Sequence, residues 1–156
     1  MSTKVSKLTV EVEYHPLTGK KVKETYSDNE GRPHRDDGPA ILTFGPTGLE
    51  LSRTYYQCGV VTRDDGPAIE VVDLEDLYQE VIWVKDGKRH RIEGPAEITT
   101  DLVTGVEFAV TWWNNDKKHR EKHAAVTTRD RDTGEINARF WFLNDKPPPK
   151  TQHLDL

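Results

Sequence analysis

Histidine, arginine and carboxylate side chains recur together in this chain, where they could serve as metal ligands or as acid–base groups. They stand in four related segments, HRDDGPA (34–40), TRDDGPA (62–68), HRIEGPA (90–96) and HREKHAA (119–125). Histidines and carboxylates are common zinc ligands, and positioned carboxylates perform acid–base catalysis. The segments follow one another at intervals of 28, 28 and 29 residues. A fixed period is typical of one structural unit stacked on copies of itself, so the chemistry depends on how that unit is built.

The same period runs through the rest of the chain. A glycine turn (Gly19, Gly48, Gly105 and Gly134) precedes most of the recurring aromatics, and an Asn/Asp/Gly turn follows each aromatic. The aromatics are Tyr26, Tyr55, Trp83, Trp112 and Trp141. Apolar residues alternate with polar ones in segments such as LTVEVEY (8–14) and VEFAVTWW (106–113), which is typical of strands. Turns rich in Asn, Asp and Gly between such segments indicate hairpins.

We therefore predict an all-β fold with little or no helix. About ten strands would form five hairpin units of 28–29 residues, arranged as one elongated, twisted antiparallel sheet. The units are expected at about 8–40, 41–68, 69–96, 97–125 and 126–146.

The HRxDGPA segments fit turn chemistry better than catalysis. Their proline cannot donate to a ladder, so it suits the first residue of a strand or a bulge, and their glycine permits close backbone approach. The Asp or Glu can accept a backbone N–H group, the Arg can pair with that carboxylate, and the final Ala leaves room for a neighbouring aromatic. We predict that the following residues shape the repeat: Arg35, Asp37, Gly38, Pro39, Arg63, Asp65, Gly66, Pro67, Arg91, Glu93, Gly94 and Pro95.

Strand geometry separates the groups that could otherwise react together. Equivalent side chains of successive two-strand units lie about 10 Å apart, so His34, His90 and His119 cannot share one metal ion. Adjacent carboxylates such as Asp36 and Asp37 point to opposite faces of a strand. No phosphate-binding loop, dinucleotide fingerprint or hydrolase motif is present in the sequence. We therefore expect no catalytic residue, no metal and no cofactor, and a protein that is not an enzyme.

Composition bounds the possibilities further. Hydrophobic residues make up 34% of the 156 residues and charged residues 31%, which suits a thin, single-layer core. The net charge of −5 argues against direct nucleic-acid binding. A single cysteine, Cys58, excludes an internal disulfide and favours a reducing, cytoplasmic compartment, and no apolar stretch could span a membrane. We expect one domain over 1–146 and a flexible tail over 147–156, which contains three prolines.

On these motifs the chain resembles the HRxDGPA hairpin-repeat proteins of phages, giant viruses and bacteria, which are similar in logic to MORN-type β-hairpin repeats. The match covers 26–40, 55–68 and 83–96 well and 112–125 in part, since His123 and Ala124 replace glycine and proline. The fifth unit keeps its aromatic but ends in PPP. The resemblance implies the fold and a viral or mobile-element origin, and it implies no activity.

The fourth and fifth units depart from the repeat and are rich in aromatics. Alternation predicts that Ile136, Ala138, Phe140 and Phe142 share one face of the last strand and that Trp141 lies on the other. Large aromatics beside a basic segment suit the centre of a protein interface. We predict a partner-binding surface made by Trp112, Trp113, Lys117, Lys118, Arg120, Arg139, Phe140, Trp141 and Phe142.

Our leading hypothesis is a non-enzymatic protein-binding module, a phage-encoded inhibitor or adaptor acting on a host (defence) protein in the host cytoplasm. A second hypothesis is a receptor or sponge for a phosphorylated small ligand or nucleotide signal, which requires a concave basic pocket. A third is an acidic mimic of nucleic acid that uses 64–80, a segment without Lys or Arg. The open edge of a sheet also permits homo-oligomers.

Overall fold

A computed structural model describes residues 8–148 and contains strands and turns throughout that range. Within that range, sixteen strands follow one another. The strands are β1 (Thr9–Tyr14), β2 (Lys21–Ser27), β3 (Ile41–Phe44), β4 (Glu50–Thr54), β5 (Tyr56–Gln57), β6 (Val60–Val61), β7 (Ile69–Asp73), β8 (Tyr78–Ile82), β9 (Val84–Lys85), β10 (Lys88–Arg89), β11 (Glu97–Asp101), β12 (Glu107–Thr111), β13 (Trp113–Asn114), β14 (Lys117–Lys118), β15 (Val126–Arg129) and β16 (Ile136–Phe140).

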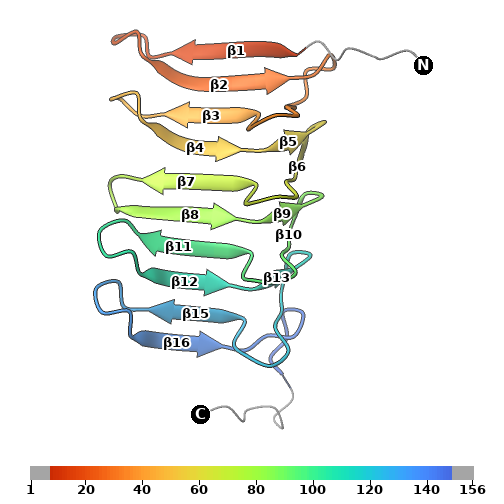
Figure 1. The fold of residues 1–156 in the computed structure, drawn as a ribbon, viewed down its shortest axis with the longest axis vertical. Helices are drawn as coiled ribbons and strands as arrows, with labels where there is room; N and C mark the ends of the chain where they lie inside the picture. Colours follow the sequence, from red (N-terminus) through yellow and green to blue (C-terminus); the bar gives the residue numbers. More distant parts are fainter. Residues whose placement is uncertain (1–7, 149–156) are drawn as a thin grey trace, which may run out of the picture.

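Ten of these strands form one antiparallel sheet in the order β1-β2-β3-β4-β7-β8-β11-β12-β15-β16. The sheet is elongated, and its hairpins stack like rungs along the long axis (Figure 1). It remains open, because β1 and β16 lie at its two ends. The predicted all-β architecture of about ten strands in five hairpin units is therefore confirmed.

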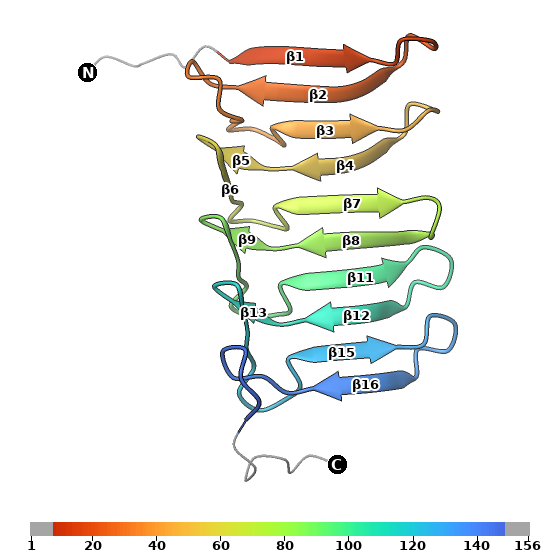
Figure 2. The same cartoon turned by 180° about the vertical axis from the view of Figure 1, so that it is seen from behind.

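Short hairpins form a second column beside the sheet. They are made by β5-β6, β9-β10 and β13-β14, and Figure 2 shows this column running down one side of the long strands. The first and fifth units carry single bridges in its place, Ser27 to Pro33 and Leu143 to Lys146. Backbone bonds join one short hairpin to the next, such as that from the Gly87 N–H to the Val61 carbonyl at 2.9 Å. Each unit thus stacks on its neighbour at two places.

The Asn/Asp/Gly turns predicted after each aromatic are the tips of these short hairpins. A two-residue turn of this kind needs two consecutive residues with positive φ, because its twist then matches that of the flanking strands. Such pairs occur in four units: Cys58 and Gly59, Asp86 and Gly87, Asn115 and Asp116, and Asn144 and Asp145. The turn residues therefore set the geometry of the second column.

The core is thin. The final alanine of each repeat segment is fully buried, and the residues are Ala40, Ala68, Ala96 and Ala125. No large side chain in 8–148 is fully buried, and most strand residues are half-buried. A low hydrophobic content is enough for such a sheet, because each alanine fills a narrow gap between units.

A β-bulge changes one predicted face. In the last hairpin Thr128 pairs with Ala138 and Arg129 pairs with Ile136, so the strand β16 contains one extra residue between these two pairs. A bulge reverses the alternation beyond it. Ile136 consequently lines the same cavity as Arg129 and Arg139, on the face opposite Phe140. The prediction that Ile136 shares a face with Phe140 is wrong for this reason.

Candidate binding surface of the C-terminal units

The repeat arginines lie on the recurring aromatic rings. The guanidinium carbon of Arg63 is 4.0 Å from the ring centre of Tyr55, and that of Arg120 is 3.9 Å from a ring of Trp112. Arg35 stacks on Tyr26 and Arg91 on Trp83 in the same way. A cation held over an aromatic face contributes about 0.5–1 kcal/mol at partly exposed sites. The Arg and the aromatic of the repeat are thus one structural pair.

Glycine in the repeat leaves space for the guanidinium. A Cβ atom on Gly66 would lie 2.9 Å from the Cζ of Arg63, and one on Gly94 would lie 2.8 Å from the Cζ of Arg91. The same arginines donate hydrogen bonds to the next carbonyl, that of Pro67 at 3.1 Å and that of Pro95 at 3.2 Å. Gly thus leaves room for the guanidinium and the Pro carbonyl accepts from it, which are roles that the sequence interpretation of these two residues did not include.

The repeat carboxylate neutralises the arginine in the first two units. Arg35 Nε donates to Asp37 at 2.9 Å and Arg63 Nε donates to Asp65 at 2.7 Å. These bonds hold the pKa of Asp37 and that of Asp65 below the usual range. In the fourth unit Lys122 stands at this position, so the carboxylate that pairs with the arginine in the first two units is absent there.

The recurring histidines lie in the column of short hairpins. His34 Nδ1 accepts the N–H of Cys58 at 3.2 Å, and the Thr62 hydroxyl at the equivalent place accepts the N–H of Asp86. The Nδ1 atoms of His90 and His119 are buried and have no hydrogen-bond partner among the described residues. No group of three or more potential metal ligands comes together within 8–148.

The nine predicted contact residues divide between the two faces of the sheet. Arg120, Arg139 and Trp141 line one cavity, and Trp112 lies against Arg120. Phe140 follows Arg139 in β16 and points to the opposite face. The structure therefore brings four of the nine together on one face and places Phe140 on the other.

Trp113 belongs to the Phe140 face and is largely buried, with 9% of its surface exposed. Its indole Nε1 donates to Glu97 at 2.8 Å. Glu97 lies on the same face as Phe140, because a row of directly paired residues joins them across the strands: Glu97, Thr111, Val126 and Phe140. The guanidinium of Arg89 stacks on the Trp113 ring at 3.6 Å. This side chain anchors a short hairpin to the sheet and offers little surface to a partner.

A basic side chain continues that face toward the C-terminal units. Lys118 Nζ lies 5.5 Å from the ring centres of both Trp113 and Phe142 and so bridges the fourth and fifth units. Lys117, the preceding residue of β14, is exposed and pairs with Asn114, so it points to the other side of the short hairpin. Phe140 itself is 50% exposed. At the equivalent place, one residue before the recurring aromatic, the other units carry Thr25, Thr54, Ile82 and Thr111.

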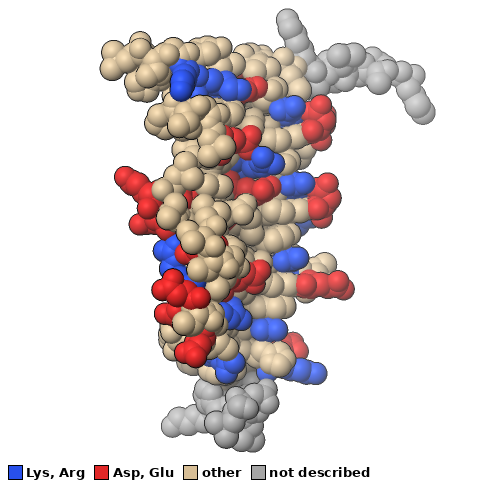
Figure 3. All heavy atoms as spheres, turned by 60° about the vertical axis from the view of Figure 1, so that its left-hand side comes forward, with Lys and Arg blue, Asp and Glu red and all other residues tan. Residues whose placement is uncertain are grey.

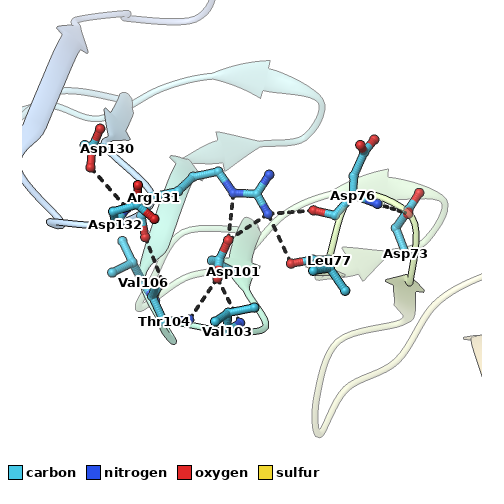
Figure 4. Close-up of polar contacts among 10 residues, drawn as sticks. All are labelled: Asp73, Asp76, Leu77, Asp101, Val103, Thr104, Val106, Asp130, Arg131 and Asp132. Carbon is cyan, nitrogen blue, oxygen red and sulfur yellow. Dashed lines mark hydrogen bonds and ion pairs between the residues drawn. The ribbon is translucent and has the colours of Figure 1, made fainter.

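Sequence reasoning missed a clasp at the far side of the sheet, where the long hairpins turn. Arg131 Nε donates to Asp101 at 2.8 Å, and Arg131 Nη2 donates to the carbonyls of Asp76 and Leu77 at 2.7 and 3.1 Å (Figure 4). One side chain thus joins the turns of three units.

Asp101 is the centre of the clasp. It accepts the backbone N–H groups of Thr104 and Val103 at 2.8 Å each, and these bonds together with Arg131 lower its pKa to about 2. Asp73 and Asp130 cap their own turns in the same way. The recurrence of Asp before the TG turn was the signal in the sequence that could have revealed this.

The acidic segment 64–80 is spread over the molecule. Glu70 lies beside Arg63 at 3.4 Å on one face, whereas Glu80 lies on the other, where burial and Glu97 raise its pKa. Asp73 and Asp76 sit in the hairpin turn between them. Basic and acidic side chains alternate along the long axis (Figure 3). The use of 64–80 as a nucleic-acid mimic stays a prediction.

The geometry defines an all-β protein whose stacked hairpins form one open, single-layer sheet. Comparisons of the chain with protein-family models, with curated proteins and with solved structures return no match. In the part of the chain that the structure describes, no helix is long and apolar enough to cross a membrane.

Proposed function

We propose that the chain is a non-enzymatic protein-binding repeat module whose partner contacts the Phe140 face of the C-terminal units. The observation that carries the proposal is the half-exposed ring of Phe140. It stands at a repeat position where the other units carry threonine or isoleucine. Aromatic side chains with a polar rim are typical of the centres of protein interfaces.

The surroundings of Phe140 indicate the chemistry of the partner. Lys117 and Lys118 lie on the neighbouring short hairpin, and Phe142 contacts Lys118. Within 8–148, β16 hydrogen-bonds in the sheet only with β15, so its outer edge can accept a strand of another chain. A partner that offers an extended segment with acidic residues fits both features.

The resemblance to repeat proteins of phages supports a more specific role. We propose that the module acts as a phage-encoded inhibitor or adaptor in the cytoplasm of its host, and that the partner is a host protein. A second copy of this chain could also pair with the open edge of β16 and form a homo-oligomer. Light scattering at increasing protein concentration distinguishes this case, because the molar mass would then rise.

The test compares two substitutions in a capture experiment from bacterial lysate followed by mass spectrometry. Phe140→Asp places a charge in the proposed interface, whereas Ile92→Asp is a matched control, because Ile92 is 85% exposed on the third repeat segment. A protein retained by the wild type and by Ile92→Asp, and lost with Phe140→Asp, supports the proposal. Identical captured sets for all three folded proteins contradict it.

A further inference from the structure

A cavity of about 320 Å³ lies on the face opposite Phe140, between the fourth and fifth units. Its volume is at the lower end of the range of small-molecule sites, roughly 300–1,000 Å³. The walls come from the fourth repeat segment and from the strands β15 and β16. The lining residues include Arg120, His123, Arg129, Ile136, Arg139 and Trp141.

The charge of this cavity differs from that of two other hollows of the sheet. Three arginines and a histidine line it, and no carboxylate does. The hollow between the first and second repeat segments has three cationic side chains and five aspartates, among them Asp37 and Asp65. The hollow between the second and third segments also combines cationic side chains with carboxylates, which are those of Asp64, Asp65 and Glu93.

The excess positive charge has a clear origin in the repeat. Lys122 replaces the carboxylate that pairs with the arginine in the first two units, and His123 replaces the glycine. Arg120 donates to the carbonyl of Ala124 at 3.4 Å, and Arg129 donates to that of Glu107 at 3.0 Å. Among residues 8–148, no carboxylate lies within ion-pair distance of these two arginines or of Arg139. Burial lowers the pKa of Arg120, as expected for a cation removed from water without a compensating anion.

We propose that this cavity binds a small ligand that carries a phosphate group and a planar ring, a nucleotide by chemical class. Guanidinium groups match the geometry of phosphate and bind it through paired, charge-assisted hydrogen bonds. Arg120 and Arg139 reach the cavity from different elements, so they can contact one phosphate from two sides. Trp141 offers an aromatic wall on which a base can stack. The small volume favours a mononucleotide over a polymer.

The proposal does not depend on protein binding, because the two surfaces lie on opposite faces of a single-layer sheet. Phe140→Asp is expected to leave ligand affinity unchanged, and Arg139→Ala is expected to leave the captured protein partner in place. Failure of one proposal is thus distinguishable from failure of the other.

The experiment is calorimetric titration of the full chain with AMP, adenosine, inorganic phosphate, a 5′-phosphorylated oligonucleotide and hexaglutamate. AMP is expected to bind tightest, with adenosine weaker by about tenfold or more, since a charge-assisted bond contributes about 1.5–3 kcal/mol. The proposal is overturned if AMP binds no better than adenosine, or if only the oligonucleotide or only hexaglutamate binds. Equal affinity for inorganic phosphate and AMP would refute the role of the planar ring.

Three variants locate the site. Arg139→Ala is expected to weaken AMP binding about tenfold or more, because it removes one phosphate contact. Lys122→Asp restores the repeat carboxylate beside Arg120 and is expected to weaken AMP binding while it preserves the fold. Arg53→Ala is the matched control, since Arg53 occupies the same repeat position as Arg139 but is paired with Glu50 at 2.6 Å. Equal losses with Arg53→Ala and Arg139→Ala, in variants that melt like the wild type, would show only non-specific attraction and would overturn the site.

Discussion

The second and fourth repeat segments use the same arginine in two electrostatic settings. Arg63 is stacked on Tyr55 and is neutralised by Asp65, whereas Arg120 is stacked on Trp112 and has Lys122 in the place of the carboxylate. The stacking distances, 4.0 and 3.9 Å, are nearly the same. The carboxylate is therefore not needed to place the guanidinium on its ring.

This difference separates two roles within one motif. The aromatic, the arginine and the buried alanine remain in the fourth unit and build the stack. The repeat carboxylate, the glycine and the proline are absent there, and the charged side chains that line the cavity on that side are all basic. Exchange of residues between the two segments is thus the direct way to test which positions hold the fold and which determine binding.

The largest effect is expected at the buried alanine, which both segments share. Ala68→Leu and Ala125→Leu each place three extra carbons in a gap where the alanine is fully buried. Overpacking of this kind costs about 1–3 kcal/mol, and the backbone bonds of Ala125 to Trp112 and Phe140 would be strained as well. Chemical unfolding should show similar losses in free energy of unfolding for both variants. A loss confined to the second unit would mean that the fourth is not stacked in the same manner.

A smaller effect is expected at the glycine, which the segments do not share. Gly66→Ala forces the guanidinium of Arg63 away from Tyr55 and should cost about 1 kcal/mol, the value of a partly exposed cation–π contact and its hydrogen bond. His123→Ala is the matched change in the fourth unit, where a Cβ atom is already accommodated. The free energy of unfolding of that variant should stay within about 0.5 kcal/mol of the wild type. Equal losses in free energy of unfolding for Gly66→Ala and His123→Ala would contradict the interpretation that Gly66 makes room for the Arg63 guanidinium.

The fold and part of the contacts within the repeat segments could be predicted from the sequence. The 28-residue period, the alternation and the turn residues were enough for the ten-stranded sheet, because a stacked hairpin has few alternatives once its period is known. The predicted pairing of Arg63 with Asp65 also agrees with their contact, whereas Gly66 makes room for the Arg63 guanidinium and not for a backbone segment.

The face of Ile136 could not be predicted, although alternation placed Phe140 and Trp141 correctly on opposite faces. The bulge in β16 moves Ile136 to the cavity side, and a bulge depends on how the Gly134 turn closes rather than on apolar periodicity. The cavity itself requires the arginines Arg120, Arg129 and Arg139, which are separated along the chain and meet only through strand pairing. The clasp of Arg131 was missed because it joins turns more than 50 residues apart.

Acid should weaken the clasp and leave the repeat segments largely unaffected. Asp101 has a pKa of about 2 in the folded chain against 3.8 as the reference value, so unfolding takes up a proton between these pH values. The stability from this group is complete above about pH 4 and is lost as the pH falls through 2. Unfolding curves of the wild type and of Asp101→Asn should therefore converge between pH 4 and pH 2. A constant difference over that range would show that ionisation of Asp101 contributes nothing.

The smallest effect on stability is expected when the carboxylate is exchanged between segments. Lys122→Asp offers Arg120 the partner that Arg63 has, and Asp65→Lys removes that partner from Arg63. The side chain of Asp65 is 82% exposed, and such surface pairs contribute only about 0.2–1 kcal/mol. Thermal melting should thus shift by about 4 °C at most for either variant, up for Lys122→Asp and down for Asp65→Lys. A large fall in melting temperature with Asp65→Lys would show that the carboxylate stabilises the fold. The lack of a carboxylate at this position in the fourth unit would then have to be compensated by other contacts within the protein, and it would no longer indicate a ligand.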